Sequence, residues 1–360
     1  MDAIELHAFN GRTGAHLRRL AVSETSWSDN INEAGTIDAT VAGGDELRDV
    51  LREYGTVVAA VSGTRVLHAG YVTHAKRDRN AGTWSIDAGG GLTILDKRLV
   101  MNYALKSSWR DGIVLIDEDH PPGAWVLRIR GTYRDVVRGL IAESLKFGEL
   151  PITLPPVQGG SAHDITYNGW DLAKVSERIG DIGDRDDGPE IRLDPILSPT
   201  WVLRFELKVA TEIVDNHWRW NALTPASRVA LDDEDMDGEA MCSECYAIGG
   251  KDEDRMLVAR ASGTALTGRG WPVLQESNKE HSTVSVLSTL QSYARADVAN
   301  GDAPQRSQAL RVGIEREVHV GDWADVRVGP ADSDVIAYKV VGVKGSADSD
   351  MLEVECRERV

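Results

Sequence analysis

Residues 55–63 read GTVVAAVSG, a run of small and β-branched residues between two glycines. Such a composition favours a short β-strand that turns at both ends. Two further β-rich stretches follow, AGYVTHAKR at 69–77 and WSIDAG at 84–89. Together these stretches predict a β unit of three strands in the N-terminal part of the chain.

A similar succession returns near the C-terminus, as GDWADVRVG at 321–329, IAYKVVGVK at 336–344 and LEVECR at 352–357. Tyr71 and Tyr338 hold matching places, although one more residue separates Gly321 from Tyr338 than Gly55 from Tyr71. We interpret the pattern as a weak internal repeat, which predicts two related β domains with helix-bearing inserts between them. Chance similarity between two β-rich segments is the alternative.

Three helices are expected between the β segments. Thr132 and Asp135 have the spacing of a capping box before the first helix, and Gly148 suits its end. The second helix follows Asn168, and the third spans about 283–299. Apolar residues recur at helical spacing in each: Tyr133, Val136, Val137, Leu140, Ile141 and Leu145; then Leu172, Val175, Ile179 and Ile182; then Val286, Leu290, Tyr293, Ala294 and Val298.

Charge and composition exclude several function classes. The 360 residues carry a formal net charge of −17, and the longest basic run is the short KRDR at 76–79. A nucleic-acid binder gains its affinity from neutralised phosphates and normally shows a basic patch, so direct binding to nucleic acid is not expected. No apolar run approaches the roughly 20 residues of a membrane span. The N-terminus has no signal-like apolar core, so we expect synthesis in a cytoplasm without signal-directed export.

Catalytic and cofactor motifs are missing from the sequence. It contains no HExxH, GxSxG or GxxxxGK[ST], and its histidines are scattered. Cys242 and Cys245 form a CxxC, but no second pair completes a zinc site, so we expect two thiols near a strand. The acidic residues are too numerous to single out a glycosidase pair. We therefore predict no catalytic and no cofactor-binding residue.

One stretch matches the calcium loop of an EF-hand in its spacing. Asp233, Asp235 and Asp237 precede Gly238, and Glu244 follows at the position of the bidentate ligand. An EF-hand also needs a helix on each side, whereas the residues before the loop include a proline and those after it are strand-like. Two interpretations remain: a calcium loop without helices, or a solvated acidic turn between strands.

A tryptophan pair is the other candidate recognition feature. NHWRW at 216–220 places Trp218 and Trp220 on one face of a strand. Such a pair can stack on a sugar, bury in a subunit contact or pack inside one β domain.

A series of short motifs follows one another over most of the chain. The motifs are Trp27 with NEAGTIDATVAG (32–43), GGGLTILDKRLV (89–100), GTYRDVVRGLI (131–141), GWDLAKVSERIGD (169–181), GPEIRLDP (188–195), AIGG (247–250), STLQSYARADV (288–298) and VHVGDWADVRVG (318–329). Their order resembles that in the tail hub proteins of long-tailed phages, which are related to the baseplate hub of contractile tails and are often called minor tail proteins in phages of actinobacteria.

The resemblance implies an α+β, mainly β fold, with two β-barrel domains like those of tail tubes and smaller α/β inserts. The expected boundaries are a first β-barrel-like domain at 1–118, a helix-containing insert at 119–195, a second β-barrel-like domain at 196–250 and 302–360, and a small insert with a helix at 251–301. It further implies a homotrimer whose six barrels form a pseudo-sixfold ring on the tail tube.

The function implied is that of a structural hub in the virion, assembled in the host cytoplasm and without enzymatic activity. Its partners would be the tail tube or distal tail protein, the end of the tape-measure protein and the tip or receptor-binding proteins, with genome DNA passing through the ring. An acidic lumen would repel DNA phosphates. Edge strands such as VIAYKVVGV at 335–343 are where neighbouring chains would pair. The alternatives are a tail-associated cell-wall hydrolase, or a carbohydrate-binding receptor module that uses Trp218 and Trp220.

Overall fold

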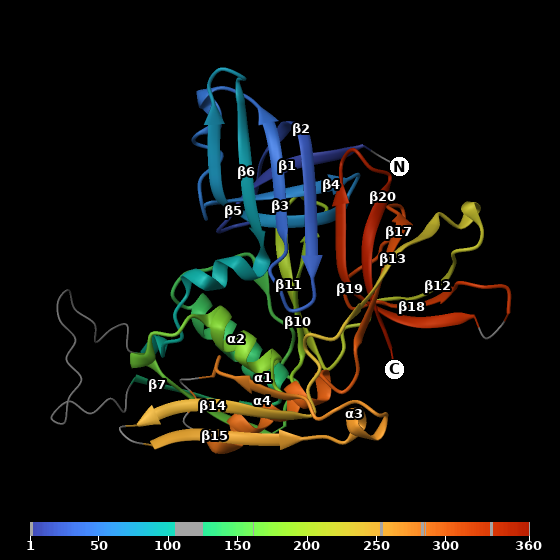
Figure 1. The fold of residues 1–360 in the computed structure, drawn as a ribbon. Coiled ribbons are helices and arrows are strands. Elements are labelled where there is room, and N and C mark those ends of the chain that lie inside the picture. The colour runs from blue at the N-terminus through green and yellow to red at the C-terminus, as the bar shows by residue number, and fades with distance from the viewer. Residues whose placement is uncertain are drawn as a thin grey trace.

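The computed structural model describes residues 3–104, 125–160, 162–252, 255–281, 284, 286–331 and 334–359. The fold is mainly β, as the sequence predicts, and twelve strands of the described chain form one continuous sheet. In Figure 1 most of this sheet occupies the upper part of the view, and the helices lie below it. No helix in the described part is long and apolar enough to cross a membrane.

The first half of the large sheet is a closed barrel. Its strands follow the order β1-β4-β5-β6-β3-β2, and β1 pairs with β2 to close the ring. β4 is buried on both faces, because one face packs in the barrel and the other against the helical insert, which explains its apolar run. The strands are β1 (Ile4–Asn10), β2 (His16–Asn30), β3 (Thr36–Ala42), β4 (Thr56–Ser62), β5 (Arg65–Asp78) and β6 (Thr83–Gly90).

The second half repeats this strand order as β12-β18-β19-β20-β17-β13. It differs in its first strand, because β12 runs parallel to β18 whereas β1 runs antiparallel to β4, and no pairing of β12 with β13 is found in the described residues. The strands are β12 (His217–Asn221), β13 (Val229–Asp237), β17 (Gln305–Gly313), β18 (Trp323–Arg327), β19 (Val335–Ser346) and β20 (Met351–Glu358). We call the two halves the first and second β units.

A bulge in the next-to-last strand of each unit fixes how the two halves correspond. The register shifts between Val72 and His74 in β5, and between Val340 and Gly342 in β19. Aligning the bulges makes Trp84 the counterpart of Leu352, the first residues of the two matched stretches, but it makes Gly70 the counterpart of Tyr338. The tyrosine match is therefore wrong by one residue, which in a strand reverses the face of the side chain.

The two β units join edge to edge within the chain. The C-terminal half of β2 pairs antiparallel with the C-terminal half of β19, from Gly342 opposite Asn30 to Ser346 opposite Ser26. A single buried cluster of apolar side chains extends through both units. The strand at 335–343 is expected from its sequence to pair with a neighbouring chain. The C-terminal part of β19 instead pairs with β2 of the first β unit in the same chain (Figure 1).

The helical insert packs on the outer face of the first β unit. Its helices are α1 (Tyr133–Leu145) and α2 (Val175–Gly183), and its strands are β7 (Val126–Gly131), β8 (Ile152–Thr153), β9 (His163–Asn168), β10 (Glu190–Leu197) and β11 (Leu203–Ala210). Thr132 caps α1 by accepting from the amide of Asp135, as predicted. α2 starts later than expected, because Leu172 adopts a left-handed conformation and is exposed.

A second insert forms its own small sheet, in the order β15-β14-β16, with α4 packed on it. Its elements are β14 (Glu244–Asp252), β15 (Arg255–Ser262), α3 (Ala265–Gly268), β16 (Gln275–Asn278) and α4 (Leu287–Asn300). Two expected boundaries therefore move: β11 and β14, placed in the second barrel by sequence, lie in the two inserts. The boundary between 118 and 119 lies outside the described residues.

Candidate functional site

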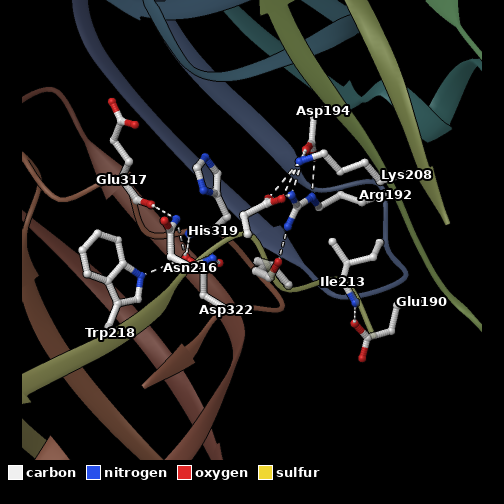
Figure 2. A network of polar contacts seen from close by, with 12 residues as sticks. Glu190, Arg192, Asp194, Lys208, Ile213, Asn216, Trp218, Glu317, His319 and Asp322 are labelled. Carbon is white, nitrogen blue, oxygen red and sulfur yellow. Dashed lines mark hydrogen bonds and ion pairs between the residues drawn. The ribbon is translucent and has the colours of Figure 1, made fainter. Parts of the chain in front are cut away.

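A network of charged and polar side chains lies where the helical insert meets the second β unit (Figure 2). Arg192 comes from β10 of the insert, Asp215 from the segment before β12, and Asp322 from the loop before β18. The side-chain oxygens of Asp215 and Asp322 and a ring nitrogen of His319 lie within 4.8 Å of one another. It is the one group of this kind in the described part of the chain.

Asp322 is the buried centre of this network, and both oxygens of its carboxylate accept hydrogen bonds. Its Oδ1 accepts from the main-chain amide of Asn216 at 2.8 Å. Its Oδ2 accepts from the indole Nε1 of Trp218 at 2.9 Å, the amide of His319 at 3.1 Å and the side-chain amide of Asn216 at 3.3 Å. These bonds hold the loop before β18 against β12, and they offset the cost of burying the carboxylate.

Arg192 links the helical insert to the segments that precede β12 and β18. Its guanidinium donates to the carboxylates of Asp194 and Asp215 and to the carbonyl of Val320. Lys208 adds bonds of 2.7 and 2.9 Å to the two oxygens of Asp215. Burial alone would lower the pKa of Arg192, but its two carboxylate partners raise the pKa above its ordinary value. Both basic groups therefore stay charged.

The first β unit contributes a carboxylate to the same junction. Burial raises the pKa of Asp29 on β2 to about 6, and the nearby charge of Arg192 opposes this shift. Asn32, also from the first unit, accepts from the amide of Ile191 at 2.8 Å. The junction thus brings together both β units and the helical insert.

A second ion pair ties β10 to β19. Glu190 accepts from Lys339, and its other oxygen accepts from the amide of Ile213 at 2.7 Å. Both charged side chains are largely buried, so the pair fixes one relative position of strand and insert.

The described contacts of the junction hold segments of the chain in place and do not form a metal site. A metal ion would need free carboxylate oxygens, but those of Asp215 already bind Arg192 and Lys208, and those of Asp322 bind N–H groups. Bound cations beside a site also disfavour a metal ion by repulsion. The network therefore holds the helical insert and the two β units in one relative position.

The calcium-loop residues do not surround a common point. Asp233, Asp235 and Asp237 lie in the extended strand β13, which pairs with β17. Glu244 lies in a different sheet, where it accepts from Arg260 at 2.5 Å and from Gln275 at 2.8 Å. The acidic stretch is thus an exposed edge strand. Asp233, Asp235 and Asp237 thus form neither a calcium loop nor a turn. Both interpretations rest on local sequence, whereas the strand depends on pairing with residues some 70 positions away.

The tryptophan pair packs within the second β unit. The rings of Trp218 and Trp220 stack with centroids 6.1 Å apart. Trp220 is only 3% exposed, and Trp218 is held by Asp322. Both rings pack against the core of the second β unit, as the packing interpretation expects, and they do not form a flat pair of exposed rings for a sugar.

The CxxC thiols lie in the core of the second insert. Cys242 and Cys245 are both buried, and Cys245 donates to the carboxylate of Asp297 at 3.1 Å. Burial, with Asp297 next in importance, raises the pKa of Cys245 to about 12. Thiols of this kind are packed and unreactive near neutral pH, as the interpretation of two thiols near a strand expects.

Comparison with solved structures identifies the class of fold. The chain aligns with the tail protein from Neisseria meningitidis MC58 at a TM-score of 0.56 and 12% sequence identity, over 99% of this chain and 96% of that chain. It aligns with the 43 kDa tail protein of prophage MuSo2 from Shewanella oneidensis at a TM-score of 0.54 and 10% identity, over 99% and 98%. For the prophage tail protein gp18 from Listeria monocytogenes EGD-e the values are 0.52 and 11%, over 98% and 94%.

The chain therefore has the fold of phage tail proteins along nearly its whole length. The resemblance to phage tail hubs seen in the sequence is confirmed at the level of the fold. No protein-family model and no curated protein matches the sequence.

Proposed function

We propose that this chain is a structural hub at the distal tip of a phage tail, where it joins the tail tube to the tip proteins without catalytic turnover. The fold shared with tail proteins supports a role in the tail. The described residues add a polar junction that holds the parts of the chain together and in which the carboxylates of Asp215 and Asp322 accept hydrogen bonds from neighbouring side chains.

One observation carries the proposal: the two β units have the same strand order and join edge to edge through β2 and β19. A chain that holds two similar units side by side can present them to a symmetric partner as two equivalent positions. Three copies would supply six positions, which matches a hexameric tail tube. The formal net charge of −17 is consistent with a channel through which DNA slides without binding.

Native mass and location test the proposal together. Labelled antibodies against the chain should mark the distal end of phage tails in electron micrographs. The native mass of the hub released from tails should be three times the chain mass of 39.2 kDa. Labelling along the tail shaft, on the head or on no part of the particle would contradict the proposal.

Clearing of peptidoglycan in a gel assay by the purified chain would instead favour the hydrolase alternative. The expected result is no clearing, with a phage lysin as the positive control.

A further inference from the structure

The two β units contact each other through β2 and β19. The equivalent strands of the opposite units do not pair with each other within the described chain. β19 pairs with β18 only as far as Lys339, and its remaining edge pairs with β2. In the first unit β5 is the counterpart of β19, and in the second unit β13 is the counterpart of β2, by strand order. The matching contact would join β5 of one copy to β13 of another.

Both of these edges are unpaired in the described chain. β4 pairs with β5 only as far as Tyr71, and the amide of Tyr54 then donates to the carbonyl of Val72 at 2.7 Å. Beyond Val72, no main-chain hydrogen bond on that edge of β5 is found among the described residues. β13 pairs with β17 on one side only, and its residues from Asp232 on are exposed. Figure 1 shows β5 and β13 on opposite sides of the two joined β units, so the contact would link copies head to tail.

The internal contact supplies the register. The pairings with β6 and β20 make His74 the counterpart of Gly342 and Lys76 that of Lys344. The pairings with β3 and β17 make Asp235 the counterpart of Ser28 and Asp237 that of Asn30. Since Lys344 lies opposite Ser28 and Gly342 opposite Asn30, Lys76 falls opposite Asp235, and His74 opposite Asp237.

Charge supports this register independently. Residues 76–79, KRDR, form the longest basic run of an acidic chain, and β13 carries the acidic run DDED at 232–235. In the transferred register Arg77 also falls opposite Glu234, so three basic or titratable positions of β5 meet acidic ones. Asp78 falls at the bulge formed by Asp232 and Asp233, where like charges oppose the pairing. Opposite charges directly across an antiparallel pair stabilise it, and like charges destabilise it. Arg77 already binds Asp45 of its own barrel, which leaves the exposed Lys76 as the principal contact.

We propose that β5 of one copy pairs antiparallel with β13 of the next, with Lys76 opposite the partner's Asp235, and that this pairing closes the ring of hubs. The proposal rests on the proposed function, because it names the surface through which the hub binds a second copy. It also gives the acidic stretch first considered as a calcium loop a role as a docking edge.

Engineered disulfides test the register directly. Cross-strand residues have Cα atoms about 4.5–5.5 Å apart, within the range of a disulfide. The pair Lys76→Cys with Asp235→Cys should link separate chains in purified tails on oxidation, with dimers and trimers on a non-reducing gel. The pair Lys344→Cys with Ser28→Cys is the matched control, and it should form a bond within one chain. Single variants and the wild type, whose cysteines are buried, should give no links between chains.

Charge-reversal variants test the pairing of β5 with β13 in a second way. Lys76→Glu should weaken association of the hub by about fivefold per interface, and adding Asp235→Lys should restore it. If tails hold the Lys76→Cys, Asp235→Cys double variant at the tip but oxidation links no chains, the pairing is overturned and the proposed function stands. Tails that lack the chain would overturn the function instead. A chain that stays monomeric in tails and at high concentration would overturn the pairing as well.

Discussion

The indole Nε1 of Trp218 lies 2.9 Å from Oδ2 of Asp322, and the carboxylate that it meets has no exposure to solvent. This single bond connects β12 to the loop before β18, two segments about a hundred residues apart. The parallel pairing of β12 with β18 begins beside this bond, with His217 opposite Trp323. The relationship places a buried carboxylate at the start of the second β unit, so we expect the stability of that unit to depend on it.

Replacing Asp322 by alanine should destabilise the fold by about 2–4 kcal/mol, because the buried amides of Asn216 and His319 and the indole of Trp218 lose their acceptor. Asp322→Asn keeps one acceptor oxygen and should cost less. Urea unfolding of the three proteins measures the difference. Equal stabilities for wild type and Asp322→Ala would contradict the role given to this carboxylate.

The two tryptophans of β12 should respond differently to truncation. Trp220→Ala should cost about 3–5 kcal/mol because it leaves a cavity in the shared core. Trp220→Phe should cost far less, since the buried Nε1 of Trp220 has no hydrogen-bond partner to lose. Trp271→Ala is the control, because Trp271 is 39% exposed. Thermal unfolding followed by circular dichroism distinguishes them, and a mild effect of Trp220→Ala would argue against its burial.

Asp29 should make stability depend on pH in a definite direction. Its pKa is raised from 3.8 to about 6 by burial, so the folded state holds the proton more tightly than the unfolded state. The folded state is therefore favoured below about pH 4, and this advantage is lost as the pH rises through about 6. Asp29→Asn should match wild type near pH 4 and exceed it above pH 6 by on the order of 1–2 kcal/mol. Chemical unfolding from pH 4 to 7 tests this, and a constant difference across the range would refute the assignment.

Calcium should leave the chain unchanged. A strand cannot wrap an ion with Asp233, Asp235 and Asp237 while Glu244 binds Arg260 in another sheet. Millimolar calcium and an equal amount of chelator should give melting temperatures within about 1 °C of each other, since a ligand that binds the native state raises its stability. A shift of several degrees that Asp235→Asn abolishes would show a site here after all.

The parts of the fold that local sequence encodes could be predicted. α1 follows from Thr132, Asp135 and the apolar stripe between them and Leu145, each residue within a turn or two of the next. The β-rich ends of the chain follow from residue type and turn glycines. The repeat of the last three strands of each β unit follows as well, although its tyrosine match is off by one residue, whereas the repeat of the first three strands does not show in the sequence.

Features set by distant pairing could not be predicted. A one-residue bulge decides whether Tyr71 or Gly70 matches Tyr338, and no local pattern marks it. The acidic run of β13 becomes a strand only because β17 pairs with it. The junction of Arg192, Asp215 and Asp322 draws on segments far apart in the chain, and nothing in the spacing of these residues indicates that they meet.

A reconstruction of the phage tail tip by electron cryomicroscopy tests the central claim most directly. The account predicts three copies of this chain around the tail axis, with their six β units in a ring about an open channel and β5 of each copy beside β13 of the next. A single copy, a ring built from other surfaces, or a position away from the axis would contradict it.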